Sequence, residues 1–195
     1  MRATLFGLLL LAPCAALAQG PEALAQRRFE EGLAAREDGR HEAALEAFTA
    51  SNELFASPNS RMMMARSLRD LGRIAEAWGE YRLAAARAQD RLSREPRFAE
   101  TVRAATREGE AIEPNIGRLR ITLVRYPANA EVEVAGRTYP GAARGDLIAV
   151  DPCEVVVRAR APGFHDAETS LEVAAGEERS SSSSSPTRSQ IPIRR

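Results

Sequence analysis

The stretch "DGRHEAALEAF" (residues 38–48) recurs 33 positions later as "LGRIAEAWGEY" (residues 71–81). The two copies share a Gly-Arg pair, a small residue and an aromatic residue at equal spacing: Gly39 and Gly72, Arg40 and Arg73, Ala44 and Ala77, Phe48 and Tyr81. Small residues let neighbouring helices approach closely, and the aromatic residues fill the space between successive layers. This repeat therefore predicts stacked helical hairpins.

Apolar periodicity predicts five helices in this half of the chain. They are expected at about residues 22–36, at 41–55, after the break "SPNS" (57–60), at 74–94, and from Pro96 to "EPN" at 113–115. Residues 19–114 thereby resemble a two-repeat tetratricopeptide array with a capping helix, although the usual Trp of the first helix is absent. The resemblance implies a concave surface that binds a peptide or another protein. A helical spacer between two ends of the chain is the alternative.

After Asn115 the sequence pattern changes from helical to alternating. "RLRITLVRY" (118–126) alternates apolar and polar residues, and "AEVEVAGR" (130–137) repeats the alternation before a glycine turn. Three further segments continue the series: "DLIAV" (146–150), "EVVVRARAPGF" (154–164) and "AETSLEVAAG" (167–176). Short strands with turns about every ten residues predict a small antiparallel β-sandwich over residues 115–178. The predicted fold class of the whole chain is therefore α+β.

One series of residues in this region is similar to the PEGA domain, a β-module of bacterial surface-layer and envelope proteins. The series comprises Pro127, Ala128, Ala130, Val132, Val134 and Gly136, then Val150, Asp151 and Pro152, and finally Val155, Val157, Ala161, Gly163 and Phe164. It departs from the family's pattern at Cys153, where Gly is usual, and at Ala135, where Asp is common. The resemblance implies a structural β-domain beside helical repeats in a bacterial envelope protein.

The first residues, "MRATLFGLLLLAPCAALAQG" (1–20), have the organisation of a secretory signal peptide. Arg2 provides the positive end, an apolar run follows, and "ALA" (16–18) is a small-residue cleavage pattern. We therefore expect residues 1–18 to be removed and the protein to be exported to the periplasm or cell surface. No later segment is long and apolar enough for a transmembrane helix in the mature chain. Pro13 stands where a lipoprotein signal has a small residue, which disfavours lipid attachment at Cys14.

The last segment, residues 179–195, contains six consecutive serines followed by Pro186. Such a run buries too little apolar surface to offset the entropy of ordering, so we expect a disordered tail. The segment has four Arg and no acidic residue, which makes it locally basic.

The composition argues against several kinds of chemistry. Basic and acidic residues number 27 each, and the Arg-rich helices lack interleaved aromatic residues, so we expect no nucleic-acid partner. The two histidines, His41 and His165, lie far apart in the sequence and have no metal-ligand spacing around them. A nucleophilic pair of Cys153 and His165 lacks an orienting third group, and no nucleotide-binding or serine-hydrolase motif occurs. We therefore expect no enzyme activity, no metal and no cofactor.

These observations predict an exported, non-enzymatic interaction or adaptor protein of the cell envelope, with a protein or peptide bound in the helical groove. The candidate contacts lie on the first helix of each pair: Arg28, Gly32, Arg36, Arg61, Ala65 and Arg69. Arg suits such a groove because its planar guanidinium holds a carboxylate through two hydrogen bonds.

A structural module whose β-half binds cell-wall polymer is the alternative function. Sugars stack on flat aromatic rings, so this function requires exposed aromatic residues on the β-half. The candidates are Tyr126, Tyr139 and Phe164, some of which must belong to the core.

Overall fold

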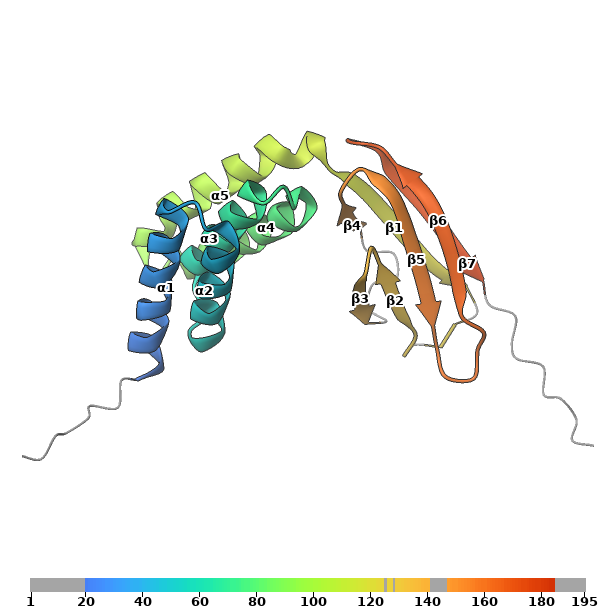
Figure 1. Cartoon of the computed structure of the whole chain (residues 1–195), viewed down its shortest axis with the longest axis horizontal. Coiled ribbons are helices and arrows are strands. Elements are labelled where there is room, and N and C mark those ends of the chain that lie inside the picture. The colour runs from blue at the N-terminus through green and yellow to red at the C-terminus, as the bar shows by residue number, and fades with distance from the viewer. Residues whose placement is uncertain (1–19, 125, 128, 141–146, 185–195) are drawn as a thin grey trace, which may run out of the picture.

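The computed structural model describes residues 20–124, 126–127, 129–140 and 147–184. A helical array comes first and a β region follows, so the fold class is α+β, as predicted. The two halves lie at the two sides of an arch, with the last helix along its top (Figure 1). The expected signal peptide with Cys14, and the last part of the expected tail at 185–195, lie outside the described residues.

In the described part of the chain, five α-helices pack against one another in the order of the sequence. Their bounds are α1 (Pro21–Glu37), α2 (His41–Leu54), α3 (Pro58–Asp70), α4 (Ile74–Arg91) and α5 (Ala99–Ile112), with 3-10 turns η1 (Pro96–Phe98) and η2 (Glu113–Asn115). The helices lie close to their predicted positions. The fifth begins at Ala99 rather than Pro96 because Pro96 opens a separate 3-10 turn.

The loops after α1 and α3 repeat the same backbone geometry at the 33-residue offset. Gly39 and Gly72 have φ values of +74° and +78°, a left-handed conformation that glycine adopts without a steric penalty. In both loops the arginine after the glycine donates its backbone N–H to the carbonyl five residues earlier, at 2.9 Å. This hydrogen bond ends both helices in the same way. The predicted repeat is therefore present in the backbone as well as in the sequence.

The side chains that recur at the same offset form the core of the array. Ala44 and Ala77 are fully buried, and so are Phe48 and Tyr81. Phe48 belongs to an apolar cluster of the first hairpin, and Tyr81 belongs to a second cluster that includes residues of α5. Small residues thus sit at the close helix contacts, and one aromatic ring fills each layer, as the sequence predicted.

Seven described strands follow the helices and form two sheets. Their bounds are β1 (Gly117–Val124), β2 (Glu131–Val134), β3 (Arg137–Pro140), β4 (Leu147–Val150), β5 (Cys153–Arg160), β6 (Ala167–Val173) and β7 (Glu178–Ser184). The larger sheet has the order β3-β2-β5-β6 and is antiparallel throughout. The smaller sheet has the order β4-β1-β7 and is mixed, because β1 pairs antiparallel with β4 and parallel with β7.

Strand β7 differs from the predicted disordered tail, which was expected to begin at residue 179. Residues 178–184, most of them serine, each pair with one of residues 118–124 in β1. Strand pairing needs only backbone N–H and C=O groups, which serine supplies. No described side chain of β7 joins the apolar core, so backbone pairing and the Arg120–Glu178 ion pair at 3.2 Å hold the strand.

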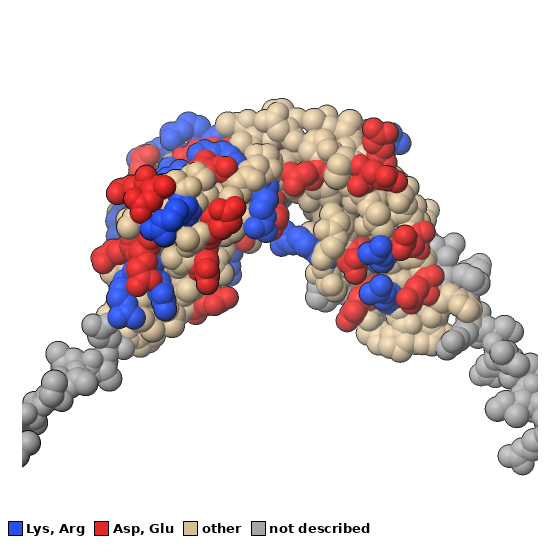
Figure 2. Space-filling model, in the orientation of Figure 1, with Lys and Arg blue, Asp and Glu red and all other residues tan. Residues whose placement is uncertain are grey.

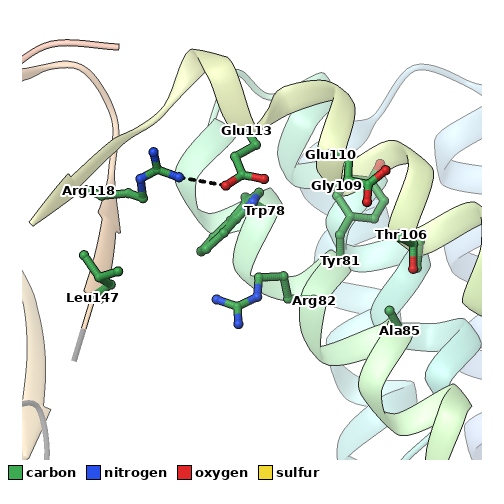
Figure 3. Close-up of a pocket in the computed structure, with 11 residues that line it drawn as sticks. Trp78, Tyr81, Arg82, Ala85, Thr106, Gly109, Glu110, Glu113, Arg118 and Leu147 are labelled. Atoms are coloured by element: carbon green, nitrogen blue, oxygen red, sulfur yellow. Dashed lines mark hydrogen bonds and ion pairs between the residues drawn. The ribbon is translucent and has the colours of Figure 1, made fainter. Parts of the chain in front are cut away.

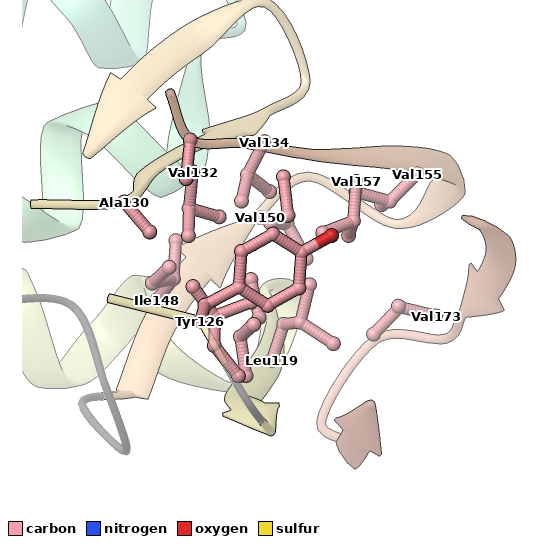
Figure 4. Close-up of a cluster of buried hydrophobic side chains, with 14 residues drawn as sticks. Leu119, Tyr126, Ala130, Val132, Val134, Ile148, Val150, Val155, Val157 and Val173 are labelled. Carbon is pink, nitrogen blue, oxygen red and sulfur yellow. The ribbon is translucent and has the colours of Figure 1, made fainter. Parts of the chain in front are cut away.

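The inward-facing side chains of the two sheets form one apolar core. The larger sheet contributes Val132, Val134, Val155 and Val157, and the smaller sheet contributes Leu119, Ile121, Ile148 and Val150. Tyr126 lies among these side chains (Figure 4) and is 7% exposed. Its ring stacks on Phe164 with 5.9 Å between ring centres. Alternation along the strands therefore places the apolar residues inside, as predicted.

Polar contacts join the β region to helix α4. The backbone N–H of Ala75 donates to Oδ1 of Asp151 at 2.9 Å, and Arg137 pairs with Glu76 at 3.1 Å. The two halves are therefore connected at α4 as well as through the covalent link from α5 to β1.

Candidate functional site

A groove lies between helices α1, α3 and α5. It consists of two adjoining hollows of about 300 and 450 Å³, which share Phe29 and Asn59 in their walls. We call these two hollows together the helical groove. The floor of the smaller hollow is formed by buried residues of α3 and α5, namely Met62, Met63, Thr101 and Ala104. Together the two hollows suit an extended ligand, with apolar contact at the buried methionines of the smaller one.

Two contacts between α3 and α5 fix the width of the groove. The hydroxyl of Thr101 donates to Oδ1 of Asn59 at 2.7 Å. The guanidinium of Arg66 donates two hydrogen bonds to Glu108, at 2.6 and 3.0 Å. Bidentate pairs of this kind hold a defined geometry, so the groove is formed before any ligand binds.

The same contacts set the protonation states of two side chains beside the groove, Glu108 and Tyr81. The hydrogen bonds from Arg66 hold the pKa of Glu108 below its usual value, although burial acts in the opposite direction. The hydroxyl of Tyr81 donates to Glu108 at 2.9 Å. Burial, together with this hydrogen bond to a carboxylate, raises the pKa of Tyr81. At neutral pH Glu108 is therefore charged and Tyr81 neutral.

Exposed side chains at the rim give the groove its accessible contacts. Phe55 lines the larger hollow and is 39% exposed, although it is a large apolar residue. Arg107 lines the smaller hollow and has no ion-pair partner among the described residues. An aromatic side chain and an arginine are the residue types that contribute most to binding energy at protein interfaces.

None of the six predicted contact residues lines the helical groove. Gly32 and Ala65 are buried, so neither presents a side chain to a ligand. A Cβ atom at position 32 would come within 2.6 Å of the Phe48 ring. The small size of these residues therefore serves helix packing, because a larger side chain would not fit there.

The four predicted arginines are engaged in ion pairs: Arg28 with Glu31, Arg36 with Asp70, Arg61 with Glu80, and Arg69 with Asp70 and Glu108. The last three of these arginines connect different helices. Burial raises the pKa of Asp70, but the hydrogen bonds from Arg36 and Arg69 outweigh it and leave the pKa lowered. These arginines thus satisfy carboxylates of the array itself.

The sequence analysis assigned a ligand contact to none of the residues that line the groove, and these residues include members of α1, α3 and α5. No ligand contact was predicted for Met62, Arg66 or Arg107. The hydrogen-bonded pair of Asn59 and Thr101 is 42 residues apart in the sequence. No local pattern marks such a pair, so only the packing of α5 on α3 reveals the groove.

The aromatic residues of the β region pack against its apolar core. Tyr126 is buried, and Tyr139 and Phe164 are partly buried against the same core. In the described β region, the three rings that the polymer-binding alternative would use are thus packed fully or partly against the core. Cys153 and His165, which the sequence analysis rejected as a nucleophilic pair, are also far apart. Cys153 begins β5, whose eight residues span roughly 25 Å, and His165 follows the other end of this strand.

Charges of both signs are interspersed over the two halves on the face shown in Figure 2. In the described ranges, no three His, Cys, Asp or Glu side chains are placed to hold a metal ion. No helix of this part of the chain has the length and apolar character needed to cross a membrane. A scan of protein-family models found no match to the sequence, and a search of curated proteins found no similar sequence.

Proposed function

We propose that the protein is an exported, non-enzymatic interaction protein of the bacterial cell envelope that binds an extended segment of a partner protein. The binding site in this proposal is the helical groove. One observation carries it: two adjoining hollows form one site, with buried methionines on the floor of the smaller hollow and arginines in the walls of both. Methionine on the floor suits this role because its flexible, polarisable side chain adapts to different apolar partners.

The sequence repeat supports the same proposal. The chain resembles a two-repeat tetratricopeptide array, and arrays of that kind bind peptides or proteins on a concave surface. Helices α1 and α3, the first helices of the two pairs, both contribute to the helical groove. The resemblance of the β-half to the PEGA domain and the signal-like first residues support a location in the envelope.

The partner segment in this proposal carries an apolar anchor beside an acidic residue. Phe55 and the methionines offer apolar contact. Arg107 offers an exposed guanidinium that forms no ion pair with a described carboxylate, although its charge acts on Glu100 in the same wall. A carboxylate of the partner would pair with Arg107 while the anchor fills the hollow.

Selection from a random peptide library against the full chain tests this proposal. We expect selected peptides to combine apolar and acidic residues, and their affinity to fall at least about tenfold in the double variant Phe55→Ser, Arg107→Glu. The matched control is Leu83→Ser with Arg87→Glu, since Leu83 is 45% exposed and both residues lie on α4 outside the groove. Peptides that bind both double variants equally well would contradict the proposal.

A further inference from the structure

A second cavity lies at the junction of the two halves and shares no lining residue with the helical groove. It has a volume of about 490 Å³, and its walls come from α4, α5, β1 and β4 (Figure 3). We call it the interdomain cleft. Its volume falls in the range of about 300–1,000 Å³ that is typical of small-molecule sites.

The apolar wall of the interdomain cleft is built around Trp78, the only tryptophan of the chain. Trp78 is partly buried, and Leu147 faces the same space from the β region with 40% of its surface exposed. Ala85 adds a small apolar residue on α4. An aromatic ring and an aliphatic side chain on opposite walls suit a flat or aliphatic ligand body.

Arg82 supplies a positive charge at the exposed edge of this apolar wall. Its guanidinium carbon lies 4.7 Å from the centre of the Trp78 ring, and Figure 3 shows the side chain beside that ring. Among the described residues, no carboxylate pairs with Arg82. By contrast, Arg118 on the cleft wall is paired with Glu113 at 2.7 Å. The stacking holds the Arg82 guanidinium in place, while its N–H groups remain available for an acid.

The acidic residues of the cleft limit the negative charge that a bound ligand can carry. Glu110 lines the cleft and has no ion-pair partner in the described ranges, and Glu113 lies on the same side. A second negative group on the ligand would meet these carboxylates and be repelled. The cleft therefore favours one negative charge on an otherwise apolar molecule.

We propose that the interdomain cleft binds a small monocarboxylic acid with an aromatic or aliphatic body. The carboxylate accepts two hydrogen bonds from Arg82, and the body lies between Trp78 and Leu147. This site is independent of the peptide groove, because the two cavities have no residue in common. A peptide that ends in an apolar residue also presents a carboxylate beside an apolar group at its C-terminus. The experiments distinguish such a peptide from a small acid.

Trp78 makes the test direct, because it is the one tryptophan of the sequence and lines the cleft, so that tryptophan fluorescence of the full chain responds to binding there. The probes are 3-phenylpropionate, 4-phenylbutyrate and octanoate, with 3-phenylpropionamide as the uncharged comparison. We expect saturable fluorescence changes with the acids and at least about tenfold weaker binding of the amide. No change with any of the three acids, or equal binding of acid and amide, would overturn the proposal.

Variants on α4 separate a charge contact from a structural effect. Arg82→Gln should weaken binding of the acids at least about tenfold, and Arg82→Lys should retain part of it, since Lys keeps the charge without the bidentate geometry. Arg87→Gln is the matched control, because Arg87 is exposed on the same helix and does not line the cleft. Circular dichroism shows whether each variant is folded. Equal affinity of Arg82→Gln and Arg87→Gln would assign the fluorescence change to another site.

A short peptide that ends in Phe, with a free or an amidated C-terminus, tests whether the cleft binds the C-terminal carboxylate of a peptide instead of a small acid. Under the proposal it binds more weakly than 3-phenylpropionate, because its preceding residues must be accommodated at the cleft mouth. Binding of the free-acid peptide at least about tenfold tighter than the small acid would overturn the small-molecule assignment.

Discussion

Asp151 of the β region caps helix α4 of the array: its Oδ1 accepts the backbone N–H of Ala75 at 2.9 Å. Ala75 is the second residue of α4, and no side chain next to the helix start provides a cap. The carboxylate also lies at the positive end of the helix dipole. One hydrogen bond therefore stabilises a helix terminus and joins the two halves of the molecule.

Replacing Asp151 with Ala should weaken both the cap of α4 and the connection between the two halves. Asp151→Ala leaves the N–H of Ala75 without its acceptor and should lower the free energy of unfolding by about 1 kcal/mol. Asp151→Asn should retain most of the stability, because Asn caps helices about as well as Asp. Urea denaturation of the three proteins measures the difference. An Ala variant as stable as the original protein would show that this bond contributes nothing.

Gly32 provides a test of packing in the helical array. A Cβ at position 32 would lie 2.6 Å from the ring of Phe48, which is fully buried and has no room to move away. Although Ala favours helices over Gly, we expect Gly32→Ala to destabilise the protein by about 1–2 kcal/mol through overpacking.

Gly79 is the matched control for this substitution. It lies within α4, and a Cβ added there would meet no atom within 4 Å. Gly79→Ala should therefore stabilise the protein by about 0.5–1 kcal/mol, the difference in helix propensity. The urea midpoints should move in opposite directions. A shift in the same direction for both variants would contradict the packing argument.

The lowered pKa of Glu108 predicts a dependence of stability on pH. The hydrogen bonds from Arg66 keep this pKa below the unfolded value of about 4.3. The resulting stabilisation is present above that unfolded value and is lost as the pH falls through the lower pKa of the folded state. Unfolding free energies measured between pH 7 and pH 3 should therefore decrease less steeply in Glu108→Gln than in the original protein. Equal slopes for the two proteins would contradict this contribution of Glu108.

The ion pair between Arg36 and Asp70 predicts that Arg36 stabilises the fold, although the sequence suggested that Arg36 contacts a ligand. The two side chains lie 2.8 Å apart, are 28% and 21% exposed, and connect α1 to α3. Charge reversal in Arg36→Glu would place two carboxylates together and should destabilise the array by about 1–2 kcal/mol. Arg27→Glu is the control, because Arg27 pairs with Glu31 at 3.7 Å on an exposed helix face. Equal thermal midpoints for the two variants would contradict this role of Arg36.

Much of the candidate site was not predictable from the sequence, and the reason differs between residues. The sequence identified α1 and α3 as the helices that contribute to a groove. It did not distinguish arginines that face a ligand from arginines that face another helix. Arg69 contacts Glu108, 39 residues away, and Arg66 contacts the same carboxylate from 42 residues away. Such pairings depend on where α5 packs, which no local period encodes.

The helical hairpins, their 33-residue offset and the change to strands follow from the amino-acid pattern alone, because each depends on local geometry. Gly39 and Gly72 permit the same turn after α1 and α3, and alternating residues place one face of each strand inside. The tertiary structure decided the rest. It placed the serine-rich β7 parallel to β1, formed the groove between α1, α3 and α5, and brought Trp78, Arg82 and Leu147 to one cleft. These features join segments that are distant in the sequence, and the free energy that joins them comes from packing and backbone pairing between whole elements.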